Sequence, residues 1–295
     1  MSWEKVTLIG VGLLGGSLGQ ALRKRSLAKS VVGLVRREES ISEAVACQAV
    51  DQATLDPAEA VDGAELVVLC TPLGRMARLT ADCLPFMRQD VVLTDVGSAK
   101  QKVSEEMTSV LAEHSGVYIG SHPMAGKEKT GVAAATSQLF QGATCVVTPT
   151  ESTPQAPLDR ICQLWADVGA EVLKMGPGEH DQLVSRVSHL PHVLSSLLAS
   201  YVLDPDADPR QRALCASGFR DTTRIAAGDV TMWRDILEQN PEAISAAIDD
   251  FSKLLSAFQD QIRQGDYDAI SDSLKVAGER RTDWAKKAHF VGGED

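Results

Sequence analysis

The feature that most constrains the fold of this chain is a glycine-rich segment near the start of the sequence. A short β-rich run, Val6 to Ile9, is followed by glycines in the spacing G-x-G-x-x-G and then by a helical pattern that continues to about Lys24. Between a strand and a helix, such glycines permit a tight turn and the close approach of a pyrophosphate, which the N-terminus of the helix stabilises. The sequence therefore predicts a dinucleotide-binding turn. Its expected cofactor contacts are Gly10, Gly12, Leu13, Leu14 and Gly15.

The end of the next β-rich run, at residues 31–35, indicates which dinucleotide is preferred. An enzyme that uses NAD usually carries Asp or Glu there, about twenty residues beyond the last glycine, to bind the ribose 2′-hydroxyl. This chain has Val35, followed by Arg36 and Arg37. Two guanidinium groups suit a 2′-phosphate, so the pattern favours NADP over NAD. In the alternative interpretation, both arginines are surface residues balanced by Glu38 and Glu39.

The order of elements along the chain predicts two domains. Short β-rich runs alternate with helical patterns up to about residue 177, an order typical of a parallel sheet covered by helices. We therefore predict an α/β fold, with a Rossmann-type, doubly wound, mostly parallel sheet in residues 1–177 and an all-helical domain in residues 178–295. The β-rich runs after residue 35 are 66–70, 91–94, 117–119, 144–147 and 171–175. Thr71 and Pro72, directly after the first of these runs, are further expected cofactor contacts.

The second half of the chain has the apolar period of helices. Apolar residues recur at helical spacing between Leu183 and Tyr201 and again between Ile244 and Ile262, which predicts helices in both stretches. Pro191 lies inside the first pattern and predicts a kink or break there. These stripes are more apolar than so small a domain needs for its own core. We therefore expect a homodimer joined through the C-terminal helices.

Composition excludes several classes of function. The formal net charge is −11, so the chain lacks the basic field that attracts nucleic acid or a membrane surface. An anionic substrate must instead be held by a few local cations. The cysteines are scattered without a C-x-x-C pair, which argues against a disulfide framework or a zinc site. With no long apolar run and no room for a signal peptide before the first strand, we expect a soluble, cytoplasmic protein.

Three polar segments stand where an α/β core does not need polarity. They are residues 94–100, 120–126 and 188–192, and the first two are expected to end strands. Because the carboxyl ends of parallel strands share one edge of a sheet, we expect Ser98 and His122 to lie close together beside the nicotinamide. A histidine there can act as a base near neutral pH. Taken alone, a histidine beside a proline is more often structural, and it is the pairing with Ser98 that favours catalysis.

Two histidines in the third polar segment raise the question of a metal. His189 and His192 are three residues apart on one predicted helix face, a spacing that brings two ligands together. No third ligand follows at a suitable spacing. We therefore expect no metal site.

Taken together, these motifs resemble those of the prephenate and arogenate dehydrogenase family of tyrosine biosynthesis. The resemblance covers nearly the whole chain, and the joint occurrence of the motifs in this order is highly specific. The motifs are the G-x-G-x-x-G-G-S start, Asp95–Ser98, Ser121–Gly126, Ser188–His192, Gly218–Arg224 and Met232–Trp233.

The resemblance implies a reaction. Hydride passes from the carbinol carbon of a 4-hydroxycyclohexadienyl substrate to NAD(P) while carbon dioxide leaves, and aromatisation of the ring supplies much of the driving force. The expected enzyme is a prephenate dehydrogenase, an oxidoreductase that forms 4-hydroxyphenylpyruvate. The alternative is an arogenate dehydrogenase that forms tyrosine directly with NADP.

The resemblance also implies roles for individual side chains. His122 is the base or hydrogen-bond acceptor for the substrate 4-hydroxyl, and Ser98 orients that hydroxyl. Arg224 binds a substrate carboxylate, a task that suits a guanidinium fork, although without the motif it is equally well explained by a helical ion pair. The other residues implied in substrate binding are His189, His192, Glu128 and Trp233.

Two other classes of protein are weighed against this interpretation. A β-hydroxyacid dehydrogenase shares the two-domain plan but relies on a lysine in the first helix of its second domain, where this chain has an arginine, two histidines and no lysine. A regulatory protein that senses NADP without chemistry would need the glycine turn. It would have no reason to keep Ser98, His122 and Arg224 together.

Overall fold

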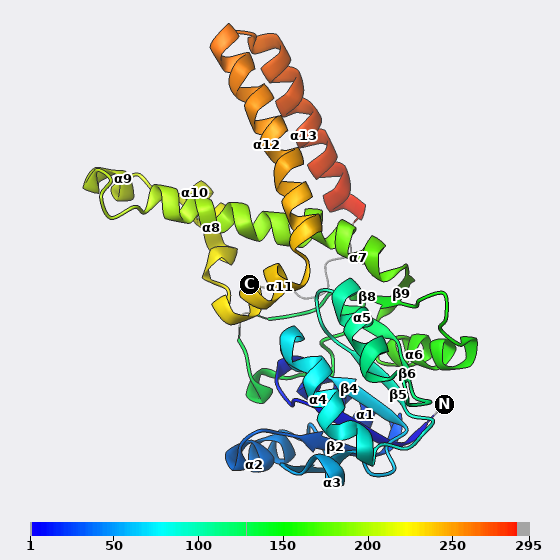
Figure 1. The fold of residues 1–295 in the computed structure, drawn as a ribbon. Helices are drawn as coiled ribbons and strands as arrows, with labels where there is room; N and C mark the ends of the chain where they lie inside the picture. The colour runs from blue at the N-terminus through cyan, green and yellow to red at the C-terminus, as the bar shows by residue number, and fades with distance from the viewer. Residues whose placement is uncertain (1, 128, 288–295) are drawn as a thin grey trace.

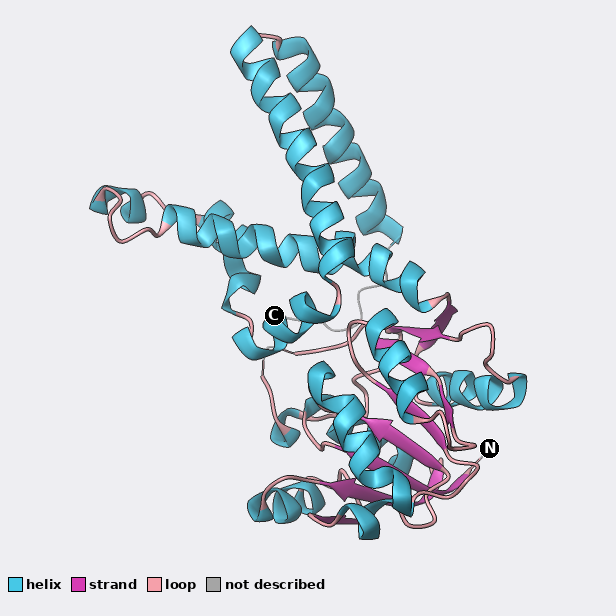
Figure 2. Cartoon of the chain, viewed as in Figure 1, coloured by secondary structure: helices cyan, strands magenta, loops and turns pink. Residues whose placement is uncertain are grey.

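The computed structural model describes residues 2–127 and 129–287, which form an α/β part followed by a helical part (Figures 1 and 2). The first part is built on a six-stranded sheet in the order β3-β2-β1-β4-β5-β6, and all neighbouring strands are parallel. Its strands are β1 (Trp3–Ile9), β2 (Ala28–Leu34), β3 (Gln52–Thr54), β4 (Leu66–Leu69), β5 (Val92–Asp95) and β6 (Val117–Tyr118). The predicted Rossmann-type sheet is confirmed. The short strand β3 is not apolar and was not predicted.

Helices cover both faces of this sheet, because its central strands bury apolar side chains on both sides. One buried cluster packs α1 and α6 against the sheet, and the other packs α3, α4 and α5 against the opposite face. The helices of this part are α1 (Leu13–Lys24), α2 (Glu38–Ala46), α3 (Pro57–Val61), α4 (Met76–Cys83), α5 (Gln101–Val110) and α6 (Gln155–Asp167). Three short 3₁₀ turns join them: η1 (Leu73–Arg75), η2 (Leu84–Phe86) and η3 (Val132–Ala134).

The last three strands form a separate sheet, whereas the runs 144–147 and 171–175 were expected to belong to the mostly parallel sheet. β7 (Gly120–Pro123) pairs antiparallel with β8 (Thr144–Thr148), and β8 pairs parallel with β9 (Glu171–Lys174). Side chains at the end of β5 contact the first strand of this second sheet. Asp95 accepts a hydrogen bond from the backbone N–H of Ser121 at 2.9 Å, and Thr94 Oγ1 lies 2.8 Å from Ser121 Oγ. These contacts hold β7 against the end of β5.

The second part is helical throughout its described residues, as predicted. It comprises α7 (Pro177–Val184), the π-helical turn η4 (Ser185–His189), α8 (Leu190–Val202), α9 (Pro209–Ala213), α10 (Ser217–Thr223), the 3₁₀ turn η5 (Arg224–Ala227), α11 (Val230–Gln239), α12 (Pro241–Gln264) and α13 (Tyr267–Lys287). α12 and α13 form a long hairpin that projects away from the α/β part, and α8 to α10 form an arm that projects to one side (Figure 1). Among the described residues, no helix is long and apolar enough to cross a membrane.

The expected irregularity at Pro191 is a π-helical turn. α7 and α8 are joined without a loop by η4, and Pro191 lies in the first turn of α8. A proline cannot donate to the carbonyl of the preceding turn and its ring clashes with that carbonyl. A single wide turn relieves the clash, and such turns are frequent at functional sites. His189 is the last residue of this turn, and His192 lies in the first turn of α8.

Candidate active site

The glycine turn has the shape that a dinucleotide requires. Gly10 has φ +92°, and a Cβ there would lie 2.8 Å from the carbonyl oxygen of Cys70. A Cβ at Gly15 would lie 2.3 Å from the carbonyl oxygen of Gly10, so the helix approaches the strand closely at this point. At Gly12, by contrast, nothing lies within 4 Å of a Cβ. Gly10 and Gly15 thus allow the close packing of the turn, whereas Gly12 leaves space for a ligand.

The helix that follows the turn begins with free donors. α1 has no side-chain cap on its first turn and no acidic residue there. The N–H groups at the start of a helix lack intrahelical partners, and together with the helix dipole they favour an anion. The hydroxyl of Thr71 is buried without a hydrogen-bond partner among the described residues, and Thr71 directly follows the half-buried Cys70 that contacts the turn. These features fit a nicotinamide dinucleotide. Pro72, the next residue, is exposed.

The two arginines expected to select NADP lie at the end of β2. Arg36 and Arg37 are both exposed, and Arg37 precedes the first residue of α2 with an extended backbone. The structure shows no ion pair or side-chain hydrogen bond between either guanidinium and Glu38 or Glu39. Among these four residues, the structure therefore does not show the pairing of the arginines with Glu38 and Glu39 that the alternative interpretation assumes.

A buried ion pair lies at the carboxyl end of β5. Asp95 and Lys100 pair with each other and both side chains are fully buried. Asp95 also accepts hydrogen bonds from the Tyr118 hydroxyl at 2.9 Å and from the Gly97 N–H at 2.8 Å. Lys100 donates to the carbonyl oxygen of Ser121 at 3.2 Å. Because each charge has several partners, the pair ties the loop after β5 firmly to β7.

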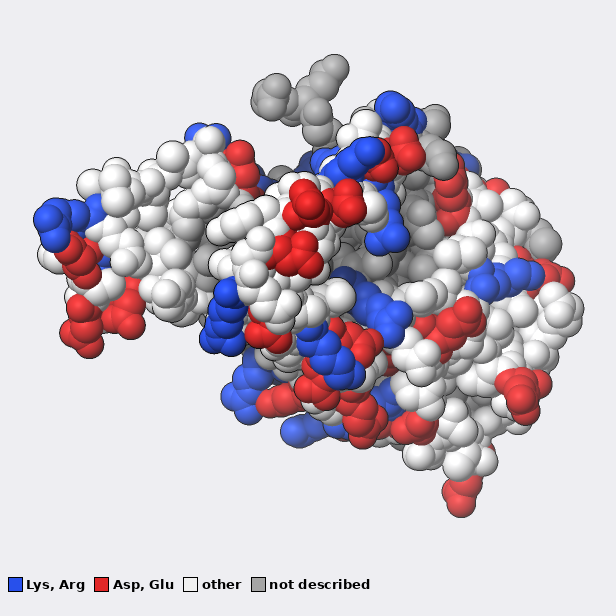
Figure 3. All heavy atoms as spheres, turned by 90° about the horizontal axis from the view of Figure 1, so that it is seen from above, with Lys and Arg blue, Asp and Glu red and all other residues white. Residues whose placement is uncertain are grey.

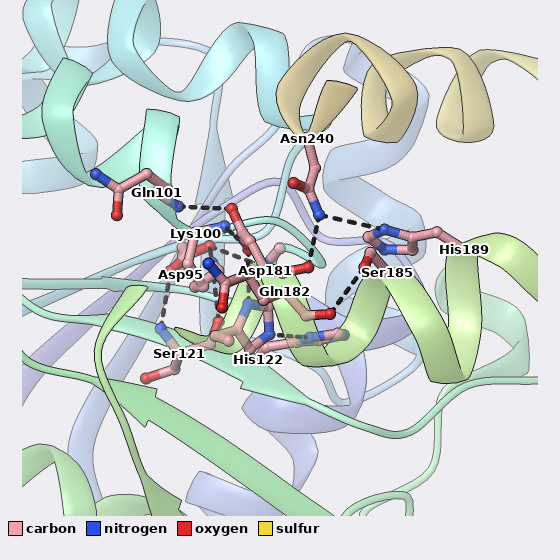
Figure 4. A network of polar contacts seen from close by, with 12 residues as sticks. Asp95, Lys100, Gln101, Ser121, His122, Asp181, Gln182, Ser185, His189 and Asn240 are labelled. Atoms are coloured by element: carbon pink, nitrogen blue, oxygen red, sulfur yellow. Dashed lines mark hydrogen bonds and ion pairs between the residues drawn. The ribbon is translucent and has the colours of Figure 1, made fainter. Parts of the chain in front are cut away.

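His122 lies within β7, whereas the sequence placed it just beyond a strand of the parallel sheet. Its Nδ1 lies 2.8 Å from Nε2 of His180, and Nδ1 of His180 lies 2.7 Å from Oδ1 of Asp181. Asp181 also accepts hydrogen bonds from the backbone N–H groups of Lys100 and Gln101 at 2.8 and 2.9 Å. Figure 4 shows this network, which joins β7, the start of α5 and the start of α7.

The surroundings of His122 favour the neutral imidazole. Burial lowers its pKa well below the ordinary value, and the nearby His180, Lys100 and His189 lower it further. The pKa of His189 is lowered to about 4, chiefly by burial. Neutral rings dominate near pH 7, and a neutral imidazole can accept a proton. His122 is therefore in the protonation state that a general base needs.

A second group of predicted residues meets around Trp233. His192 stacks on the indole, with ring centroids 3.5 Å apart and planes at 7°. His189 meets the indole edge-on, with centroids 6.1 Å apart. The Nδ2 of Asn240 lies 3.5 Å from Nδ1 of His189 and donates to the carbonyl oxygen of Asp181 at 2.9 Å. Asn240 thus links the ring cluster to the network around His122 (Figure 4).

The other predicted residues are placed less centrally. Ser98 is half-buried in the loop that follows Asp95, the last residue of β5. Arg224 is exposed at the start of η5, directly after α10. Asp221, three residues before Arg224, forms an ion pair with Arg220 at 3.1 Å. Glu128 lies outside the described residues. Among the residues that are described, no group of three or more His, Cys, Asp and Glu side chains is arranged to hold a metal ion.

Sequence reasoning missed the residues that hold His122. His180 and Asp181 follow the glycines and proline of residues 176–178, which were interpreted only as a domain boundary. Lys100 lies in the polar segment 94–100 but has no predicted role, and Asn240 lies in none of the motifs. The signal in the sequence that could have identified them is the adjacent His180-Asp181 pair in the first predicted helix of the second domain. Charged and ionisable side chains are rarely buried unless they have a structural or functional partner.

The fold and the site define the class of this protein. A glycine turn with a free helix N-terminus, beside a buried neutral histidine at the carboxyl edge of a parallel sheet, is the arrangement of a nucleotide-dependent dehydrogenase.

Comparison with known proteins identifies the family within this class. Two family models match, described as the nucleotide-binding domain of prephenate dehydrogenase over residues 18–174 and the dimerization domain of prephenate dehydrogenase over residues 176–276. The chain is 31% identical over 280 residues to the prephenate dehydrogenase of Bacillus subtilis, which covers 94% of this chain and 75% of that protein. The chain therefore belongs to the prephenate dehydrogenase family.

Solved structures agree with this assignment. The prephenate dehydrogenase of Aquifex aeolicus in complex with hydroxyphenyl propionate and NAD+ has 30% identity and a TM-score of 0.90, over 96% of this chain and 99% of that chain. The arogenate dehydrogenase of Synechocystis has 27% identity and a TM-score of 0.83, over 95% and 99% of the two chains.

Proposed function

We propose that this protein catalyses the oxidative decarboxylation of prephenate to 4-hydroxyphenylpyruvate, with hydride transfer to NAD(P). The single observation that carries the proposal is the buried, neutral His122 at the edge of the dinucleotide-binding sheet. The named activity of the Bacillus subtilis relative, similar over nearly the whole chain, supports it.

In the proposed reaction, C4 of the substrate loses a hydride, which a nicotinamide bound at the glycine turn would accept. His122 takes the proton of the 4-hydroxyl at Nε2 as the C4–O double bond forms. The bond between C1 and its carboxylate then breaks, and its electrons pass through the ring to the oxygen as carbon dioxide leaves. His122 returns its proton to that oxygen, so the phenol forms with no net proton release. General-base assistance of this kind contributes about 10²–10⁴ in rate.

The other predicted residues position the substrate. Ser98, in the loop after β5, orients the hydroxyl, and Arg224 binds a substrate carboxylate through its guanidinium fork. His189 and His192 line the pocket. Trp233 closes it through its stack on His192, and Glu128 gates it.

The preferred dinucleotide is NADP. Arg36 and Arg37, exposed at the end of β2 without an ion pair to Glu38 or Glu39, are available to a 2′-phosphate. The absence of a carboxylate at Val35 removes the usual partner of the NAD ribose. The Aquifex aeolicus structure contains NAD+, so NAD is the alternative that the assay must include.

Arogenate is the second candidate substrate. It differs from prephenate by an ammonium group in place of the side-chain keto group, and the similar Synechocystis structure is an arogenate dehydrogenase. A β-hydroxyacid dehydrogenase is disfavoured because α7, η4 and α8 contain no lysine. The fold of such enzymes is nonetheless similar, with a TM-score of 0.53 at 16% identity to a 3-hydroxyisobutyrate dehydrogenase.

We further propose that the domains divide at residues 177 and 178 and that the enzyme is a homodimer joined through the C-terminal helices. In α12 only Ile244 and Ala247 are buried, whereas Leu254 and Leu255 are 68% and 62% exposed. Uncharged surface covers much of the α8–α10 arm (Figure 3), where Tyr201 is 79% exposed. Apolar faces of this extent favour a second copy of the chain. All six cysteines are free, in keeping with a cytoplasmic enzyme.

The proposed function is tested by following reduced cofactor at 340 nm with purified protein. Prephenate and arogenate are each offered with NADP and with NAD, and the aromatic product is identified by chromatography. We expect the highest kcat/KM for prephenate with NADP. Binding of NADP without turnover of either substrate would overturn the proposal and favour a cofactor-sensing protein.

A further inference from the structure

A chain of three buried side chains leads from His122 into the helical part of the protein. His122, His180 and Asp181 are 9%, 0% and 2% exposed. The two short contacts that join them, 2.8 Å between the imidazoles and 2.7 Å between His180 and Asp181, leave Nε2 of His122 as the end of the chain. The rings of His122 and His180 meet edge to face at 71°, which suits an in-plane nitrogen contact.

The donor and the acceptor of each contact in this series of side chains can be assigned by starting from Asp181. Asp181 accepts backbone N–H groups on both carboxylate oxygens, so it is an acceptor toward His180 as well. His180 then carries a proton on Nδ1, and a His180 ring with this single proton presents an unprotonated Nε2. His122 must therefore donate to it from Nδ1. A neutral His122 held in this way has its lone pair on Nε2.

We propose that His180 and Asp181 are positioning residues for the general base. They hold His122 in the tautomer that can accept the substrate proton at Nε2, and they stabilise the imidazolium formed when it does so. The inference rests on the proposed function, and it adds two residues to the site that sequence motifs did not supply. The proton that moves is the hydroxyl proton alone, and the Nδ1 proton of His122 stays in the bond to His180.

The charges around His122 explain why such support is needed. Positive charge on Lys100 from the start of α5, on His189 from η4 or on His180 from α7 disfavours an imidazolium at His122, whereas a neutral His180 accepts the Nδ1 proton of His122. The negative groups nearby are Asp95 and Asp181. Asp95 is committed to Lys100, Tyr118 and backbone donors. Asp181 is the carboxylate that reaches His122, through His180.

Substitution of His180 tests the proposal by kinetics. His180→Phe removes both hydrogen bonds, whereas the amide oxygen of His180→Gln can still accept from His122 Nδ1. We expect kcat to fall about 100-fold in His180→Phe, since misplacement of a catalytic group by about 1 Å has this order of effect. His180→Gln should retain at least about tenfold more activity, and substrate KM should change less than about threefold in both. His114→Gln is the matched control, because His114 also accepts a hydrogen bond through a ring nitrogen but lies before β6, outside the network.

Two kinetic outcomes contradict the proposal. One is a kcat for His180→Phe within about threefold of the wild type, and the other is equal activity of the Phe and Gln variants, which indicates a purely structural role. Wild-type protein that turns over neither prephenate nor arogenate would instead overturn the proposed function. The two failures are thus distinguishable.

A spectroscopic measurement on the unmodified protein does not depend on whether the His180 variants fold. Nitrogen-15 NMR of protein labelled at histidine reports which ring nitrogen carries the proton, and His122→Asn assigns the signal. At pH 7.5 we expect His122 to be protonated at Nδ1 and unprotonated at Nε2. A His122 protonated at Nε2 would overturn the proposal, whatever the kinetics show.

Discussion

His192 stacks face to face on Trp233, with ring centroids 3.5 Å apart, and Gly228 leaves the space that the stack needs. A Cβ at Gly228 would lie 2.7 Å from the indole Nε1 and 3.2 Å from Cε1 of His192. The two rings therefore occupy the volume that any larger residue at position 228 would fill.

Gly228→Ala should push the indole away from His192. Overpacking of this kind costs about 1–3 kcal/mol, and displacement of a substrate-positioning group can cost about 100-fold in rate. We expect substrate kcat/KM to fall about 10- to 100-fold, measured by reduced-cofactor formation. The Kd for the dinucleotide should not change, because the glycine turn is separate from the stack. An unaltered kcat/KM would remove the stack from substrate binding.

Alanine substitution should have different effects at Gly19, in α1, and at Gly12, in the turn before it. A Cβ at Gly19 would lie 1.9 Å from the carbonyl oxygen of Ala49, whereas nothing lies within 4 Å of a Cβ at Gly12. Gly19→Ala should therefore destabilise the fold by about 3 kcal/mol or more, well beyond the helix-propensity gain of about 1 kcal/mol. Gly12→Ala should keep the stability and weaken dinucleotide binding at least about tenfold. Chemical denaturation and cofactor titration measure the two effects, and equal stability losses would contradict the assignment of Gly12 to the ligand.

Removal of both arginines after β2 should change the cofactor preference. A hydrogen bond to a charged group contributes about 1.5–3 kcal/mol, so Arg36→Ala with Arg37→Ala should lower kcat/KM for NADP about 10- to 100-fold. The value for NAD should change less than about threefold. Arg78→Ala, an exposed arginine on α4, is the control for loss of surface charge. A parallel loss with both cofactors would show that the arginines do not recognise the 2′-phosphate.

Arg224→Ala should weaken substrate binding. The loss of a charge-assisted contact to a carboxylate predicts a rise in substrate KM of about tenfold or more, with a smaller effect on kcat. Arg224→Lys should recover only part of the affinity, because an ammonium lacks the planar fork. Arg234→Ala, which breaks an exposed ion pair with Glu238 on α11, controls for general charge effects. An unchanged KM for Arg224→Ala would return Arg224 to a structural role.

Much of the fold follows from local patterns in the sequence. The parallel strands β1, β2, β4 and β5 contain short β-rich runs of mostly apolar residues, and the helices after Pro177 have a clear helical period. The second sheet was not predictable in the same way. β7 consists of Gly120–Pro123 and has no apolar pattern. Ser121 within it contacts Thr94 and donates to Asp95, which lie 27 and 26 residues earlier in the sequence.

In the site, too, some residues were predictable from local sequence patterns and others were not. His122, His189, His192 and Trp233 stand in motifs, and motifs made them candidates. His180 is buried by contacts that join α7 to β7 across 58 residues of sequence. Such long-range pairing depends on how the helical part packs against the sheet, so local spacing carries no signal for it.

The buried His189 predicts that the protein loses stability in mild acid. Its pKa is about 4 in the folded protein and about 6.5 in an unfolded chain. Between these values the unfolded chain binds a proton that the folded chain does not, so the free energy of unfolding falls as the pH falls. The lowered pKa of His122 acts in the same direction. From pH 7.5 to pH 4.5, His189 alone should remove about 2–3 kcal/mol.

Urea denaturation at pH 7.5, 6.0 and 4.5, at fixed protein concentration, measures this loss. Carboxylates also titrate in this range, and they do so equally in a variant that lacks the imidazole. His189→Gln is therefore the reference, and its free energy of unfolding should fall by about 2 kcal/mol less than that of the wild type over the same interval. If the free energy of unfolding of the two proteins depended on pH in the same way, His189 would titrate normally. Its ring would then be open to solvent rather than enclosed between Trp233 and Asn240.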